Sequence, residues 1–494
     1  MADMQELTRL GLRELGAAIR ARRVSCREVM GAFLERIAEV NPLHNAIVAL
    51  RPAEELLAEA DAHDRLLAEG RWLGVLHGVP QAIKDLAFTR GLVTTMGSRI
   101  LRDSVPAMDS LFVERMRAAG ALIIGKSNTP EFGLGSQTYN DVYGVTRNAH
   151  DPALTAGGSS GGAAVAVALG MLPVADGSDM MGSLRNPAAF NRVVGLRPSR
   201  GRVPGWPALD QFIAQLGIAG PMARTVRDCG LLLSVQAGHD DRDPLSLDGS
   251  GAPFAEWAAG AASAAADASA ATADLALASG KRIGWLGDLD GHLAMQPGVL
   301  DSCRRALGCL EAIGCRVEPV PARALGVPLP ALWECWLVLR TVAAAPALFE
   351  HLRKARELMK PEAIWEAERG LAMSAEEVAR ASQVRTRFYQ SWLRLFERHD
   401  FLVLPSAQVF PFDAAIHWPA EVGGRRMDTY HRWMEVVTYA TLSGSPAISM
   451  PVPLADPTKA PAPGDLAGIQ IIGAPRDDLG VLRLAAAYEA GLAG

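Results

Sequence analysis

The stretch from Thr155 to Arg202 constrains the fold most, because it contains two serine clusters flanked by glycines, GGSSGG at 157–162 and GSDMMGS at 177–183. Glycine allows positive φ angles and lets the backbone approach another group closely. Successive backbone N–H groups in such a loop can form a concavity that binds an anion. A serine beside these N–H groups has the parts for acyl transfer, a nucleophile and an oxyanion hole. The base that this chemistry needs must come from elsewhere in the chain.

The composition indicates a globular enzyme. Of 494 residues, 49% are hydrophobic and 21% are charged, and the formal net charge of −5 gives no basic excess for binding nucleic acid. The N-terminus, MADMQELTRL, lacks the pattern of a signal peptide, and no uninterrupted apolar run reaches the length of about eighteen residues that predicts a transmembrane helix. We therefore expect a cytoplasmic protein with no nucleic-acid or membrane partner.

The cysteines give no sign of a metal site or a disulfide framework. Neither a C-x-x-C pair nor an H-E-x-x-H motif occurs, so the sequence predicts no bound metal. Free cysteines are usually buried as small apolar side chains. We expect reduced, mostly buried thiols at six positions: Cys26, Cys229, Cys303, Cys309, Cys315 and Cys335.

Helical and strand-like segments alternate along much of the chain. Ser25 is a predicted N-cap within the first helical region, 5–40, which Asn41-Pro42 is expected to end, and Asp109 and Thr225 are predicted caps of later helices. Helices are further predicted at 110–119, 221–237, 299–313 and 479–490, and strands at 79–83, 121–124, 281–286, 315–320, 401–405 and 467–472. This alternation predicts an α/β fold.

Two regions depart from this pattern. Residues 240–280 begin with acidic turn residues and become rich in alanine, so 246–280 is predicted to be a surface insertion, helical in part. Residues 331–400 are predicted to be mostly helical, and 331–435 as a whole is a candidate wall of a substrate pocket. Trp336, Trp418 and Trp433 in this region are predicted to contact the substrate, and ordinary core packing is the alternative.

Lys84 is the first candidate base. It ends the apolar run 79–83 and is one of only six lysines in a chain rich in arginine. A buried lysine can lose its proton near neutral pH, whereas an arginine cannot. The alternative is a lysine whose stem lies on apolar surface while its ammonium group reaches water. Lys126, which follows the strand predicted at 121–124, is a second candidate.

Three kinds of chemistry fit a glycine-rich serine loop. Residues 157–161 match the G-x-S-x-G motif of α/β-hydrolases, with His417 or His431 as the base, but that motif requires a preceding strand and 148–156 resembles a loop. A phosphate-binding loop is a second possibility, but it requires a following G-K-[ST] motif, which this stretch lacks. A lysine that deprotonates one serine, which in turn deprotonates a second, needs only these three side chains within hydrogen-bond reach.

The chain resembles the amidase signature family of hydrolases along almost its whole length. The family's motifs occur in the family's order at 76–85 (LHGVPQAIKD), 119–128 followed by Glu131-Phe132, 157–162, 177–187, 444–451 and 468–473. The resemblance implies a single domain, 1–494, with an α/β/α fold in which helices cover both faces of a mixed, twisted sheet. It implies an enzyme without a cofactor that hydrolyses a small-molecule carboxylic amide, with anilides, esters or carbamates as further substrates. A homodimer would be in keeping with the family.

The resemblance also assigns roles by position. Lys84 matches the catalytic lysine, and Lys126 falls on a structural position. Ser159 matches a bridging serine that follows a cis peptide bond, and Ser183 matches the nucleophile that becomes acylated. The backbone N–H groups of four residues match the oxyanion hole: Met180, Met181, Gly182 and Ser183.

Two departures from the family pattern bear on specificity. Met181 replaces the first of two glycines that usually precede the nucleophile, and Met180 and Met181 would place flexible apolar surface beside the site. We expect a changed choice of substrate with activity retained, because methionine keeps its backbone N–H. Arg197 stands in place of a usual lysine, which suits a structural position.

Amide hydrolysis has two alternatives as the function of this chain. One is a glutaminase subunit of a tRNA-dependent amidotransferase, and the other is a binding protein without activity.

Overall fold

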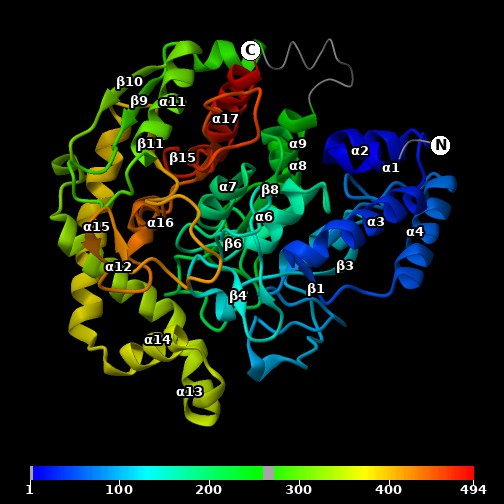
Figure 1. Cartoon of the computed structure of the whole chain (residues 1–494), viewed down its shortest axis with the longest axis horizontal. Coiled ribbons are helices and arrows are strands. Elements are labelled where there is room, and N and C mark those ends of the chain that lie inside the picture. Colours follow the sequence, from blue (N-terminus) through cyan, green and yellow to red (C-terminus); the bar gives the residue numbers. More distant parts are fainter. Residues whose placement is uncertain (1–3, 260–271, 494) are drawn as a thin grey trace.

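An eight-stranded mixed sheet forms the centre of the protein in the computed structural model, which describes residues 4–259 and 272–493 (Figure 1). The strand order is β10-β9-β11-β15-β14-β7-β8-β6. The pairs β10/β9 and β9/β11 are parallel, and the other neighbours are antiparallel. The strands are β6 (Val174–Asp179), β7 (Val194–Arg197), β8 (Ile218–Ala223), β9 (Arg282–Trp285), β10 (Arg316–Pro319), β11 (Phe401–Pro405), β14 (Ala447–Pro451) and β15 (Gly468–Ile472).

A three-stranded sheet, β1-β3-β2, lies next to the β6 end of the large sheet. The Gln81 amide donates to Val174 O at 3.2 Å, and the Lys84 backbone N–H donates to the Asp176 carboxylate at 3.2 Å. These bonds, one near each end of β2, hold β2 beside β6. The smaller strands are β1 (Ile47–Val48), β2 (Pro80–Lys84), β3 (Leu122–Ser127), the hairpin β4 (Tyr139–Asn140) with β5 (Gly144–Val145), and the hairpin β12 (Glu421–Val422) with β13 (Arg425–Arg426).

Helices cover both faces of the large sheet (Figure 1), as the α/β/α prediction requires. Successive residues of β11 show this. Phe401 and Val403 pack into the core that α11 and α17 share, whereas Leu402 and Leu404 pack into the core that α12 and α15 share. The helices are α1 (Met4–Arg9), α2 (Leu12–Arg20), α3 (Cys26–His44), α4 (Ala53–Ala68), α5 (Leu111–Ala118), α6 (Gly161–Ala168), α7 (Arg185–Asn191), α8 (Val226–Gln236), α9 (Ala252–Ala259), α11 (Val299–Ala312), α12 (Leu329–Ala344), α13 (Phe349–Ala355), α14 (Pro361–Ala372), α15 (Ala375–Phe396), α16 (Thr438–Ser443) and α17 (Asp478–Ala493).

Several helix ends follow the predicted capping. Ser25 Oγ accepts the Glu28 N–H at 3.0 Å, and the Thr225 hydroxyl accepts the Asp228 N–H at 3.2 Å. Asp109 was the wrong cap, because Ser110 is the N-cap of α5 while Asp109 instead accepts the Arg90 N–H at 2.7 Å.

Two predicted boundaries were also wrong. Helix α3 continues through Pro42 to His44, although Asn41-Pro42 was expected to end it. The helix predicted from 221 begins only at Val226, because Ile218–Ala223 is strand β8, which pairs with β6 on one side and β7 on the other.

The alanine-rich region and the long apolar helices have part of their surface inside the protein. In α9, Phe254 and Ala258 are buried, and residues 260–271 of the predicted insertion lie outside the described residues. The helical run Leu329–Leu358 is long and apolar enough to cross a membrane, but 56% of its most apolar 18-residue stretch is buried inside the protein, as in a core helix.

The six cysteines are free thiols, and all but Cys309 are buried.

Candidate functional site

Three segments that lie far apart in the sequence bring Lys84, Ser159 and Ser183 to one place. Lys84 is the last residue of β2, Ser159 lies in the loop before α6, and Ser183 lies between β6 and α7. The peptide bond between Gly158 and Ser159 is cis, as the resemblance implied. Lys84 and Ser159 are almost completely buried, and Ser183 is 8% exposed.

The Lys84 side chain lies among hydroxyl groups. Its Nζ is 2.8 Å from Ser159 Oγ, 2.8 Å from Ser160 Oγ and 3.0 Å from Ser178 Oγ. A neutral amine can both donate to and accept from such hydroxyls, so a proton has a direct route between Lys84 and Ser159. Sequence reasoning did not single out Ser160 or Ser178, although both belong to the glycine-flanked clusters.

Burial makes Lys84 a usable base. Removal from water lowers the pKa of its amine to about 7, against the opposing attraction of the Asp176 and Asp179 carboxylates. Asp176 lies behind the lysine and accepts the Lys84 backbone N–H, and burial raises the pKa of Asp176 to about 6. A large share of Lys84 is therefore neutral near pH 7.

The serines open onto a cavity of about 310 Å³. Ser159 and Ser183 both line it, and the Met180 and Met181 side chains lie beside them. Most of the remaining wall is apolar and comes from segments far apart in the sequence. The other lining residues are Leu86, Met96, Phe132, Gly133, Leu134, Gly135, Ser178, Asp179, Gly217, Arg340, Ala343, Ala344, Ala347, Leu348 and Met434.

Met180, Met181 and Ser183, in and after the loop that follows β6, all line this cavity. The Gly182 N–H donates to Asp179 Oδ1 at 2.9 Å, so this N–H group already has an acceptor. The N–H groups of Met180, Met181 and Ser183 have no hydrogen-bond acceptor in the part of the chain that the structure describes. Three of the four predicted oxyanion-hole donors are thus free to bind an anion.

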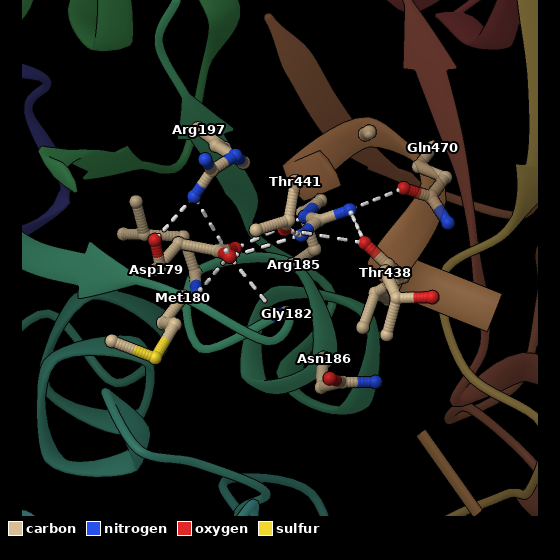
Figure 2. Close-up of polar contacts among 12 residues, drawn as sticks. Asp179, Met180, Gly182, Arg185, Asn186, Arg197, Thr438, Thr441 and Gln470 are labelled. Carbon is tan, nitrogen blue, oxygen red and sulfur yellow. Dashed lines mark hydrogen bonds and ion pairs between the residues drawn. The ribbon is translucent and has the colours of Figure 1, made fainter. Parts of the chain in front are cut away.

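Buried ion pairs hold this loop in place (Figure 2). Asp179 pairs with Arg185 at 2.9 Å and with Arg197 at 3.5 Å, and Arg185 also donates to Gln470 Oε1 at 2.6 Å. Although burial alone would raise the pKa of Asp179, the two guanidinium groups hold it well below its usual range. Arg197 also donates to the Asp179 and Leu216 carbonyls, which fits the predicted structural role.

A Gly182→Ala variant should destabilise the fold through this loop. Gly182 has a φ of +77°, and an added Cβ would lie 2.2 Å from Asn186 Oδ1. We expect the free energy of unfolding to fall by about 2 kcal/mol or more, measured by urea denaturation. The control is Gly308→Ala, in the middle of α11 with nothing within 4 Å of the added Cβ, which should leave the protein as stable or slightly more stable. Equal stabilities for the two variants would contradict this account of the loop.

Lys126 occupies a different environment. Its Nζ donates to Ala87 O at 2.8 Å and to Thr89 Oγ1 at 2.7 Å, and thus joins β3 to the loop after β2. Burial lowers the pKa of Lys126 to about 8, but its bonds connect parts of the fold and do not include the serines of the cavity.

Neither histidine of the G-x-S-x-G hypothesis reaches the cavity. His417 stacks on Tyr139 in a small neighbouring pocket, and His431 is fully buried against Trp333 and Trp365. The loop before Ser159 also follows no strand of the sheet. The geometry therefore does not supply the triad of an α/β-hydrolase.

The predicted substrate contacts fall into two groups. Met180 and Met181 line the cavity. Trp336 and Trp433 are 0% exposed within the core on one face of the sheet and do not line it, and Trp418 lines the small neighbouring pocket with Tyr139. Phe132 belongs to the family motif around 119–132, but it was not predicted to line the cavity, as it does. Arg340 also lines the cavity, and nothing in the local pattern distinguishes it from other arginines of the chain.

The comparisons with known proteins agree with this geometry. The family profile described as Amidase matches residues 28–482. The chain is 33% identical to an acylamidase of Rhodococcus erythropolis over 98% of this chain and 96% of that protein. It is 34% identical to a glutamyl-tRNA(Gln) amidotransferase subunit of Acidothermus cellulolyticus, over 99% and 95% of the two chains. The solved structure of a bacterial aryl acylamidase superposes with a TM-score of 0.85 at 29% identity, over 98% and 96%.

Proposed function

The chain belongs to the amidase signature family of enzymes that hydrolyse amides, and from this premise we propose that it cleaves carboxylic amides through an acyl-enzyme on Ser183. One observation carries the proposal. The buried Nζ of Lys84 lies 2.8 Å from Ser159 Oγ, at the wall of a cavity that Ser183 also lines. A base, a hydroxyl that can pass on a proton and a second hydroxyl open to substrate are the parts that acyl transfer needs.

The proposed reaction begins with proton transfer. Neutral Lys84 accepts the proton of Ser159, and Ser159 accepts that of Ser183. The Ser183 oxygen attacks the amide carbonyl, and the free N–H groups of the preceding loop stabilise the negative oxygen that forms. The same relay then returns a proton to the leaving amine. In the second half of the reaction the relay accepts a proton from water, water attacks the acyl group, and Ser183 regains its proton as the acid leaves.

The cavity wall supports an apolar substrate. Met180, Met181, Phe132 and Leu86 provide apolar surface next to the serines. Burial of an aryl or alkyl group against such surface contributes about 25 cal/mol per Å² of apolar area. We therefore propose that amides and anilides with an aryl or other apolar part are the preferred class, and that esters and carbamates of the same shape are also cleaved.

A glutaminase function is the alternative, because the chain is 34% identical to an amidotransferase subunit and 33% identical to the acylamidase. Free glutamine carries an ammonium and a carboxylate group, which need charged partners when buried. The charged lining residues are Asp179, already paired with Arg185 and Arg197, and Arg340, already paired with Glu366. The lining of the cavity therefore favours an apolar amide over glutamine as the substrate.

A substrate panel tests the choice. The purified chain would be assayed without any partner on acetanilide, benzanilide, phenylacetamide and glutamine. We expect hydrolysis of the aryl amides with a kcat/KM at least about 10-fold above that for glutamine. Hydrolysis of glutamine alone, or of none of the four, would contradict the proposal.

The pH dependence should respond to Asp176. Its carboxylate stabilises the protonated form of Lys84, and an Asp176→Asn variant removes that charge while its Oδ1 can still accept the Lys84 N–H. The pKa of Lys84 should then fall further, so the acidic limb of kcat/KM against pH should move to lower pH by about 1 unit. A limb that stays in place or moves to higher pH would contradict the role of Lys84 as the base.

A further inference from the structure

Arg340 is a buried arginine on the cavity wall, 5% exposed, that comes from α12. Its Nε donates to Glu366 Oε1 at 2.7 Å, and its Nη2 donates to the Tyr430 hydroxyl at 2.6 Å. The Tyr430 hydroxyl in turn donates to Glu366 Oε1 at 2.6 Å. These three bonds hold one side of the guanidinium group rigidly and balance its charge with one carboxylate.

The other side of the guanidinium group lacks a strong acceptor. Among the described residues, the partner of Nη1 is Met180 Sδ at 3.6 Å, and a thioether is a weak acceptor. Met180 and Arg340 both line the cavity, and Met180 lies three residues before Ser183. Three alanines of the adjoining wall, Ala343, Ala344 and Ala347, leave room in front of α12 for a ligand.

A strong donor with no strong acceptor is costly in a buried site unless a ligand completes it. Because Glu366 already balances the charge of Arg340, a carboxylate bound there would carry an unbalanced charge into a largely apolar cavity. An uncharged oxygen, such as a ketone or nitro oxygen, would satisfy Nη1 without that cost.

We propose that Arg340 selects substrates that carry an uncharged oxygen acceptor away from the amide that is cleaved, through a hydrogen bond from Nη1. The inference rests on the proposed amide hydrolysis. It makes Arg340 a specificity residue that contacts the substrate, while Glu366 and Tyr430 position its guanidinium group.

Matched anilides test this selection. Each pair has the same shape and differs by an acetyl group in place of an isopropyl group, placed on the acyl part in one pair and on the aniline ring in the other. We expect wild-type protein to prefer the acetyl member of at least one pair by about 10-fold or more in kcat/KM, since sites built around a hydrogen bond discriminate in this way. In Arg340→Met this preference should fall to near one, with kcat/KM for the isopropyl member changed much less.

Removal of Arg340 leaves Glu366 buried without its ion-pair partner, although the Tyr430 hydroxyl still donates to it. If the single variant does not fold, the double variant Arg340→Met/Glu366→Gln takes its place in the test. Equal kcat/KM values for both members of both pairs in wild-type protein would overturn the inference, whatever the variants do. A third member of each set carries a carboxyl group in place of the acetyl group, and a wild-type preference for that member over the acetyl member would also overturn the inference. Failure of wild-type protein to hydrolyse any anilide or other aryl amide would instead contradict the proposed function, and the inference would fall with it.

Discussion

A Ser183→Ala variant is expected to lower kcat/KM for an anilide by about 10⁴-fold or more, because it removes the atom that forms the acyl-enzyme. The fold should remain intact, since Ser183 lines an open cavity and its backbone carbonyl, which accepts the Ser160 N–H at 3.2 Å, is retained. Steady-state kinetics with the released aniline as readout would measure the loss, and circular dichroism would check the fold.

Ser234→Ala is a suitable control for this loss. Among the residues that the structure describes, its hydroxyl donates to Leu231 O within α8, and Ser234 does not line the cavity. Activity should therefore stay within about 2-fold of wild type, as for most substitutions remote from a site. Substantial activity in purified Ser183→Ala would show that another group is the nucleophile.

The second large effect is expected for Lys84→Met, which should reduce kcat/KM by about 10²- to 10⁴-fold, the usual contribution of a general base. Only the neutral amine can accept a proton, and the pKa of about 7 means that this form gains population as the pH rises through 7. In wild-type protein kcat/KM should therefore rise about tenfold per pH unit below 7 and level off above it. Lys84→Met should lose this dependence.

Two further variants separate the chemistry of Lys84 from its packing. Lys84→Arg should not restore activity, because a guanidinium group keeps its proton in this pH range. Lys126→Met removes the second buried lysine, whose bonds go to Ala87 and Thr89. That variant should be less stable, but the folded protein should keep the acidic limb. A limb that disappears in Lys126→Met and persists in Lys84→Met would assign the base to Lys126.

Much of the fold could be predicted from local pattern. Segments such as Phe401–Pro405 and Asp478–Ala493 have the apolar spacing of their element, and Ser25 and Thr225 cap helices through bonds within four residues. Strand β8 could not be predicted, because its sequence IAGPMA has little β-propensity and its pairing with β6 and β7 determines its conformation.

The site was predictable to a similar degree. Lys84 stands out as a lysine in an apolar run, and the two serine clusters stand out by their glycines. The contacts of Lys84 with Ser178 and Asp176 depend on β2 lying beside β6, which no local pattern encodes. Trp336 and Trp433 were predicted to bind substrate, but tryptophan is equally suited to a core, and both lie fully buried there.

Covalent labelling of the serine tests the central claim most directly. Wild-type protein, Ser183→Ala and Lys84→Met would each be treated with an aryl fluorophosphonate. An activated serine oxygen attacks the phosphorus of this reagent, and fluoride leaves. Intact-mass spectrometry would then measure the mass of each protein. The account predicts one adduct on wild-type protein, none on Ser183→Ala, and labelling slowed by about 10²-fold or more in Lys84→Met. A single adduct that persists in Ser183→Ala, or no adduct on folded wild-type protein, would contradict the assignment of Ser183 as a nucleophile activated by Lys84.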